Sequence, residues 1–183
     1  MWHSLRSVRS ASQQRELRTI ALREQLREPD TALVRTRNLQ VKTSDATVKI
    51  RAPAEKVWLA LTSPGLVKQW QYGSDLLTTW EVGTSIVFRN EWNGQVFEQK
   101  GTVLEFSPAS RLKYSLFVPR PDLQDIPEHR FFMIYELAES GGITSLLVRQ
   151  EDPRPSAPDE SSGGDDGPDV LSILKELVEV KMP

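Results

Sequence analysis

Residues 84–106, TSIVFRNEWNGQVFEQKGTVLEF, set the fold class of this chain because they predict a long β-hairpin. Apolar and polar side chains alternate over 84–92, which is typical of a strand with one buried face. Asn93-Gly94 follows, and this pair favours a two-residue hairpin turn because both residues tolerate positive φ. The return strand is expected over 95–106, so neighbouring strands of this protein should pair antiparallel.

The sequence on both sides of the hairpin predicts three helices and further strands. Residues 53–70, PAEKVWLALTSPGLVKQW, predict two short helices separated at Ser63-Pro64, each carrying a tryptophan. Residues 169–180 predict a C-terminal amphipathic helix that Asp169 caps. Other alternating segments predict further strands at 46–51, 112–118, 131–137 and 143–150.

The order of these elements predicts an α+β fold. A sheet with one apolar face needs a cover, and the C-terminal helix offers an apolar stripe of suitable length. We therefore expect a curved antiparallel sheet wrapped around a long C-terminal helix, with two short helices after the first strand. This domain should span residues 45–183, while residues 1–44 form an Arg-rich extension in which 12–27 predicts a helical arm.

The two parts of the chain differ in charge, although the net charge of the whole is only −2. Residues 1–43 carry nine basic and four acidic side chains, whereas the remaining residues carry fourteen basic and twenty-one acidic ones. Such an arm can pack on the body or on a second copy, act as an organelle transit segment, or bind nucleic acid. Its interleaved acidic residues argue against the last two roles. We expect an arm or plain extension that contacts a protein partner or a second copy, and no nucleic-acid binding.

The composition fits one domain that does not cross a membrane. With 183 residues the chain has the length of a typical single domain. Its longest apolar run, residues 57–61, is far shorter than the roughly 20 residues that a membrane-spanning helix needs. Cysteine is absent, which fits a reducing cytosol, and we expect a cytoplasmic protein.

Residue types that build common catalytic and metal sites are scarce in this sequence. The chain has only two histidines, His3 and His129, which leaves little material for a metal site or a Ser-His-Asp triad. No glycine-rich phosphate loop is present, and the acidic segment 151–169 lacks the ligand spacing of a calcium loop. We therefore expect no metal and no cofactor.

The aromatic residues and one carboxylate are the remaining candidates for a site. The aromatic side chains fall mostly in the expected strands and short helices, and this placement fits either a filled core or the lining of a pocket. Glu105 shares strand parity with Val103, so its side chain is expected to point inward and could act as an acid or base. Alternatively, Glu105 occupies an exposed strand position or pairs with Arg111.

Several short motifs occur in an order that resembles a known family. They are Ala52-Pro53, Val57-Trp58, Trp70, Gly101 with Val103 and Glu105, Pro108 with Arg111-Leu112, Gly142 with Thr144, and Leu171 with Leu174 and Lys175. Together they resemble the START-like (SRPBCC) superfamily. More narrowly, they resemble the family of the C-terminal domain of the activator of the 90-kDa heat-shock protein ATPase. The resemblance covers about residues 45–181, and it departs from the family where Pro168-Asp169 replaces the usual Gly-Trp.

This resemblance implies a helix-grip fold with a cavity between the sheet and the C-terminal helix. It implies that a small hydrophobic molecule or lipid binds there, without intrinsic catalysis and with no catalytic residue. In this interpretation Trp58 belongs to the core, and the cavity is lined by Trp70, Phe88, Trp92, Val103, Glu105, Tyr114, Leu116 and Tyr135. Two alternatives stay open: an interaction module that activates a chaperone ATPase, and a cyclase- or dehydratase-like enzyme that uses Glu105.

Overall fold

The structure, a computed structural model, describes residues 41–121, 123–154 and 169–182. The expected helical arm at 12–27, most of the 1–44 extension and most of the acidic segment 151–169 lie outside the described residues. No helix within the described ranges is both long enough and apolar enough to cross a membrane.

One antiparallel sheet of seven strands dominates the described part of the chain. The strands are β1 (Lys42–Ile50), β2 (Asp75–Thr78), β3 (Ser85–Trp92), β4 (Gln95–Ser107), β5 (Arg111–Phe117), β6 (Phe131–Ser140) and β7 (Ile143–Asp152). They lie in the order β1-β7-β6-β5-β4-β3-β2, so each strand from β2 to β7 pairs with its neighbour in the chain, and β1 closes beside β7. The antiparallel sheet predicted from the sequence is confirmed, whereas β2 was not predicted because it has only four residues.

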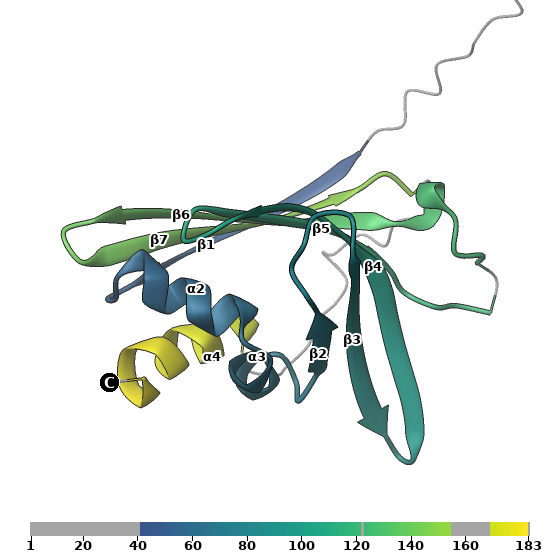
Figure 1. Cartoon of the computed structure of the whole chain (residues 1–183), viewed down its shortest axis with the longest axis horizontal. Helices are drawn as coiled ribbons and strands as arrows, with labels where there is room; N and C mark the ends of the chain where they lie inside the picture. Colours follow the sequence, from purple (N-terminus) through teal and green to yellow (C-terminus); the bar gives the residue numbers. More distant parts are fainter. Residues whose placement is uncertain (1–40, 122, 155–168, 183) are drawn as a thin grey trace, which may run out of the picture. The chain divides into compact units, whose positions relative to one another are not determined.

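Helices cover the concave side of this sheet (Figure 1). They are α2 (Ala54–Thr62), α3 (Pro64–Trp70) and α4 (Val170–Glu176), which continues as the π-helical turn η3 (Leu177–Lys181); a short 3-10 turn, η1, spans Pro127–His129. The Asp169 carboxylate accepts a hydrogen bond from the Leu171 N–H at 3.2 Å, so the predicted cap of the C-terminal helix is confirmed. The predicted α+β fold, with two short helices after the first strand, is therefore correct.

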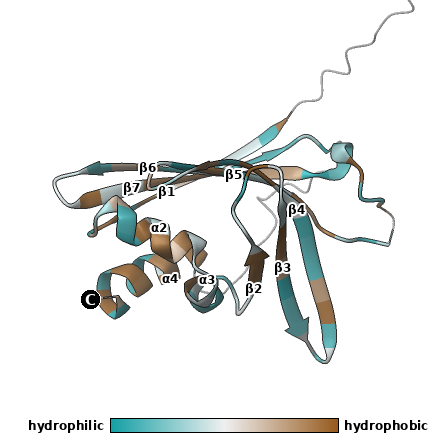
Figure 2. Cartoon of the chain, in the orientation of Figure 1, coloured by the Kyte–Doolittle hydropathy of each residue, from teal (hydrophilic) through white to brown (hydrophobic). Residues whose placement is uncertain are grey.

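The core lies between the concave face of the sheet and the helices. Leu174 and Val178 of the C-terminal helix are fully buried, as is Val57 of α2. Alternate residues of each strand meet them, and the apolar colouring of β2, α2 and α4 is visible in Figure 2. Burial of these side chains removes apolar surface from water, which is the main stabilising contribution to such a fold.

Two indole groups close the C-terminal end of α2. The Ala60 carbonyl would normally accept from the N–H four residues later, but that residue is Pro64, which has none. The Trp70 Nε1–H donates to this carbonyl instead, at 2.9 Å, and the Trp80 Nε1–H donates to the Thr62 carbonyl at 2.9 Å. Trp70 is therefore part of the helix termination as well as of the core, where it is only 3% exposed.

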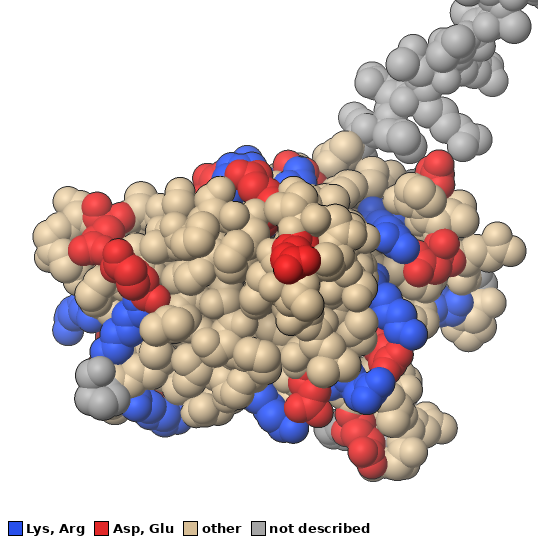
Figure 3. Space-filling view, viewed as in Figure 1, with Lys and Arg blue, Asp and Glu red and all other residues tan. Residues whose placement is uncertain are grey.

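Charged residues on the outside of the protein largely form pairs. In the face shown in Figure 3 most acidic and basic side chains lie toward the rim, and one acidic group stands near the centre. Arg149 of β7 forms a bidentate pair with Asp45 of β1 at 2.7 and 2.8 Å. This pair is solvent-exposed, so it fixes the register of β1 more than it adds to the free energy of unfolding.

Candidate functional site

Strand β4 leaves β5 at a glycine, and this corner creates the candidate site. The last pair between the two strands is Lys100 with Phe117, next to Gly101 with Leu116. A Cβ atom added at Gly101 would overlap the Ser115 carbonyl oxygen and stand 2.6 Å from its carbonyl carbon. Only glycine permits so close an approach of the two backbones. Beyond this corner the β3–β4 hairpin runs steeply away from β6 and β7 (Figure 1).

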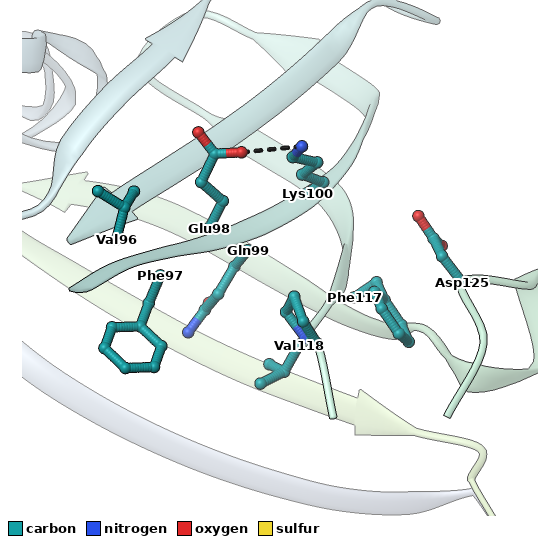
Figure 4. A pocket seen from close by; sticks show the side chains of 9 residues that line it. Val96, Phe97, Glu98, Gln99, Lys100, Phe117, Val118 and Asp125 are labelled. Carbon is teal, nitrogen blue, oxygen red and sulfur yellow. Dashed lines mark ion pairs between the residues drawn. The ribbon is translucent and has the colours of Figure 1, made fainter. Parts of the chain in front are cut away.

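A pocket of about 590 Å³ occupies the wedge between the diverging strands. One wall is the start of β4, and the other is the segment that follows β5; Figure 4 shows Phe97, Gln99 and Val118 pointing to the same side. We call it the wedge pocket, and it is lined by Val96, Phe97, Glu98, Gln99, Lys100, Phe117, Val118, Pro119 and Asp125. Its size and its mostly apolar walls with a few polar groups are typical of small-molecule sites.

The charged groups of the wedge pocket are already paired. Glu98 accepts from the Arg89 Nε–H at 2.7 Å and forms an ion pair with Lys100 at 2.8 Å. The hydrogen bonds from Lys100 and then Arg89 lower the pKa of the Glu98 carboxyl below its usual value. Asp125 forms an ion pair with Arg130 at 2.8 Å. Since each acid has a basic partner, the pocket offers little unbalanced charge to a ligand.

Three of the predicted lining residues form an aromatic row on the concave face. Phe88 and Tyr114 have ring centroids 5.8 Å apart, and those of Tyr114 and Tyr135 are 5.9 Å apart. The two tyrosine hydroxyls form a hydrogen bond with each other at 3.0 Å. Burial raises the pKa of both phenols, that of Tyr114 strongly, so both are neutral at physiological pH. Phe88 lies directly opposite Gln99 of the wedge pocket, so the row begins beside that pocket.

The other predicted residues lie apart from the wedge pocket. Val103 and Leu116 are buried on the same concave face as the row, and Trp70 is buried at the end of α2. The backbone of Trp92 pairs with Gln95, and its side chain lies outside the described part of the structure. None of the seven predicted residues whose side chains are described lines the wedge pocket, and the structure does not test whether the predicted residues line a cavity of their own.

The expectation that Glu105 points inward with Val103 is wrong. The pairing of β4 with β5 shifts between these two residues, because Leu104 is an extra residue in a β-bulge. The bulge reverses the parity, so Glu105 lies opposite Lys113, a neighbour of the inward-facing Tyr114. On the outer face Glu105 accepts from the Arg111 Nε–H at 3.0 Å, which agrees with the alternative of an Arg111 partner.

Sequence reasoning did not identify the wedge pocket, although one signal for it was present. The strand expected at 95–106 is about five residues longer than its partner expected at 112–118, so one end of it must extend beyond the partner. Pro119 and Pro121 also end β5, because proline cannot continue a central strand. The length mismatch indicates an overhang, but the shape of the wedge depends on the corner at Gly101.

Comparison with known proteins gives one family and several structures of similar fold. The family model described as "Activator of Hsp90 ATPase homolog 1-like protein" matches residues 51–179. The solution structure of ChR145 from Cytophaga hutchinsonii is 30% identical, with a TM-score of 0.64, and the match covers 78% of this chain and 97% of that one. None of the functionally curated proteins matches this chain.

Two further structures support the same fold. Protein MLL2253 from Mesorhizobium loti is 26% identical, with a TM-score of 0.60, over 75% of this chain and 96% of that one. The Aha1 dimer from Colwellia psychrerythraea is 17% identical, with a TM-score of 0.58, over 78% of this chain and 99% of that one. At that identity the likeness to the Colwellia protein concerns the fold alone.

Proposed function

Since this chain belongs to the activator of Hsp90 ATPase homolog 1-like family, we propose that it binds a small apolar or amphipathic molecule and does not itself catalyse a reaction. The molecule binds in the wedge pocket and reaches along the concave face of the sheet toward the aromatic row. The wedge pocket is the observation that carries this proposal, because it combines a suitable volume with apolar walls and balanced charge.

The aromatic row supports an amphipathic ligand. Phe88 continues the concave face from Gln99 toward the paired hydroxyls of Tyr114 and Tyr135. Each hydroxyl carries one proton, and their mutual hydrogen bond uses only one of the two. The second proton can be donated to an acceptor on the ligand, such as a carbonyl or hydroxyl oxygen. An apolar body with one such polar group therefore fits these residues.

The role of Glu105 as an acid or base receives no support from this geometry. Its carboxylate pairs with Arg111 on the outer face, away from the aromatic row. Arg111 also forms an ion pair with Glu136. A protein partner or self-association through the N-terminal arm rests on residues outside the described part of the chain and stays a prediction.

Binding of dodecanoate, followed by native mass spectrometry and by thermal shift, tests the proposal. Phe97→Ser removes an apolar wall of the wedge pocket at a position that is 54% exposed, so it should leave the fold intact. We expect Phe97→Ser to weaken binding about 5- to 10-fold, as for the loss of a central apolar contact. The matched control is Leu59→Ser on α2, a 52% exposed leucine that does not line the pocket.

Equal weakening of dodecanoate binding by Phe97→Ser and Leu59→Ser would contradict the proposal. Absence of binding to the native chain by dodecanoate and by uncharged apolar probes such as naphthol would contradict it as well.

A further inference from the structure

The start of β4 has one edge without a strand partner. Residues 95–99 pair with β3 on one side, but the pairing with β5 on the other side begins only at Lys100. Between described residues, no backbone hydrogen bond joins this stretch to the segment after β5. A free strand edge carries unpaired N–H and C=O groups that can pair with another extended chain.

The direction of these backbone groups follows from neighbouring hydrogen bonds. The Gly83 N–H donates to the Val103 carbonyl at 2.8 Å, and the Val103 N–H donates to the Thr84 carbonyl at 3.0 Å. The backbone of Val103 therefore faces the β3 side, and the direction alternates along the strand. Val96 and Glu98 each lie an odd number of residues before Val103. Their backbone N–H and C=O groups consequently point to the opposite edge of β4, into the wedge pocket.

A second hydrogen bond confirms this assignment independently. The Thr102 N–H donates to the Ser115 hydroxyl of β5 at 3.2 Å, so it faces the β5 side. Thr102 lies an even number of residues from Val96 and Glu98, and the register of β4 with β3 is continuous from Ser85 to Trp92. The backbone groups of all three residues therefore point to the same side of β4. Two N–H and two C=O groups are thus aligned along the free edge.

Two features that usually protect an edge, proline and a β-bulge, are missing from this stretch. Residues 95–99 contain no proline, and the β-bulge of β4 lies further along, at Leu104. Val96 and Phe97 are 58% and 54% exposed and stand beside the free backbone groups. By contrast, the outermost strand β2 has only four residues, and β1 carries exposed charges such as Asp45 and Lys49.

We propose that an extended, uncharged and apolar peptide segment of a partner protein binds in the wedge pocket by adding a strand to the free edge of β4 at Val96 and Glu98. This mode gives affinity through backbone hydrogen bonds and selectivity through side-chain pockets. The acids of the pocket already have basic partners, so a charged peptide would gain little there. The apolar walls favour side chains such as valine at alternate positions.

The volume of the pocket favours a single strand over a second copy of this chain. A strand of four residues occupies roughly 650 Å³, from a rise of about 3.4 Å per residue, a strand spacing of about 4.8 Å and a sheet thickness of about 10 Å. This is close to the pocket volume of about 590 Å³. Edge-to-edge pairing with a second copy would bring a two-stranded hairpin, about twice as large, against the wall formed by Val118 and Pro119.

The test uses a blocked, fluorescent heptapeptide of alternating valine and threonine as the probe. Its twin is methylated on the alternate backbone nitrogens that would face β4, which removes donors without removing side chains. We expect the unmodified peptide to bind and the methylated twin to bind at least about tenfold more weakly. Binding should also slow hydrogen exchange at the amides of Val96 and Glu98.

A variant tests the same edge from the protein side. Val96→Pro removes the N–H that faces the pocket and keeps the hydrogen bonds to β3, a placement that edge strands tolerate. It should weaken peptide binding about tenfold, whereas Val96→Thr, which keeps the N–H, should stay within about twofold. Equal binding of both peptides, or native-like peptide binding by Val96→Pro, would overturn the proposal. So would absence of peptide binding by a chain that dimerises in sedimentation analysis.

Discussion

Replacing Gly101 by alanine should destabilise the protein although the side chain gains only one methyl group. The added Cβ would overlap the Ser115 carbonyl oxygen and lie 2.6 Å from the carbonyl carbon and 3.1 Å from the Leu116 Cα. These are backbone atoms of a paired strand, so they cannot turn aside as a flexible side chain can. The corner between β4 and β5 must open to accommodate the methyl group.

The expected loss follows from two opposing contributions. Overpacking against a rigid neighbour costs about 3 kcal/mol at the upper end of the usual range. Alanine gains about 1 kcal/mol over glycine in a regular strand, because the unfolded chain loses less conformational freedom. The free energy of unfolding should therefore fall by about 2 kcal/mol. With a urea m-value of about 2 kcal/mol per molar, the unfolding midpoint should move down by about 1 M.

Urea titration followed by tryptophan fluorescence measures this shift, and Gly65→Ala is the matched control. Gly65 lies in α3, and a Cβ added there meets nothing within 4 Å. Alanine at this helical position should stabilise the protein by about 0.5 kcal/mol, the opposite sign. A Gly101→Ala protein that is as stable as the native chain would refute the close approach of β4 and β5 at this corner.

Three further substitutions or conditions test other parts of the structure. Trp70→Phe leaves the Ala60 carbonyl without a donor, because Pro64 cannot supply one, and should lower the free energy of unfolding by about 1–3 kcal/mol in urea titrations. Burial raises the pKa of Tyr114 and Tyr135, so above pH 10 the unfolded chain releases protons that the folded chain retains. The free energy of unfolding should therefore fall with rising pH by about 1.4 kcal/mol per pH unit for each tyrosine. Tyr114→Phe should reduce this slope in urea titrations above pH 10. An unchanged slope would argue against burial of the Tyr114 hydroxyl. Glu105→Gln removes one half-exposed ion pair, so it should lower the free energy of unfolding by at most about 1 kcal/mol and leave dodecanoate binding unchanged. A large loss of stability or of dodecanoate binding would count against the position of Glu105 on the outer face.

Local patterns in the sequence were sufficient to predict most of the architecture. The alternation over 84–92 and the Asn93-Gly94 turn predict the β3–β4 hairpin, and both turn residues have positive φ in the structure, 51° and 72°. Asp169 and Pro64 mark the beginnings of α4 and α3, as expected from their capping and N1 preferences. These features depend on residues close together in the chain, so their physics can be read directly from the sequence.

The candidate site depends on contacts between residues that are distant in the sequence. The parity of Glu105 relative to Val103 was wrongly predicted because a bulge at Leu104 changes the count, and no local pattern marks this residue as extra. The indole of Trp70 donates to the Ala60 carbonyl that Pro64 leaves unpaired, a contact that no local pattern predicts. The sequence contains both residues but does not show that they meet.

The sequence by itself therefore determined the element order, the antiparallel pairing and the covered face of the sheet, because periodicity and turn chemistry act over a few residues. Only the tertiary structure decided where β4 parts from β5 and which backbone groups face the opening. That outcome depends on the contact of Gly101 with the Ser115 carbonyl, an approach of two backbones that no side-chain pattern encodes.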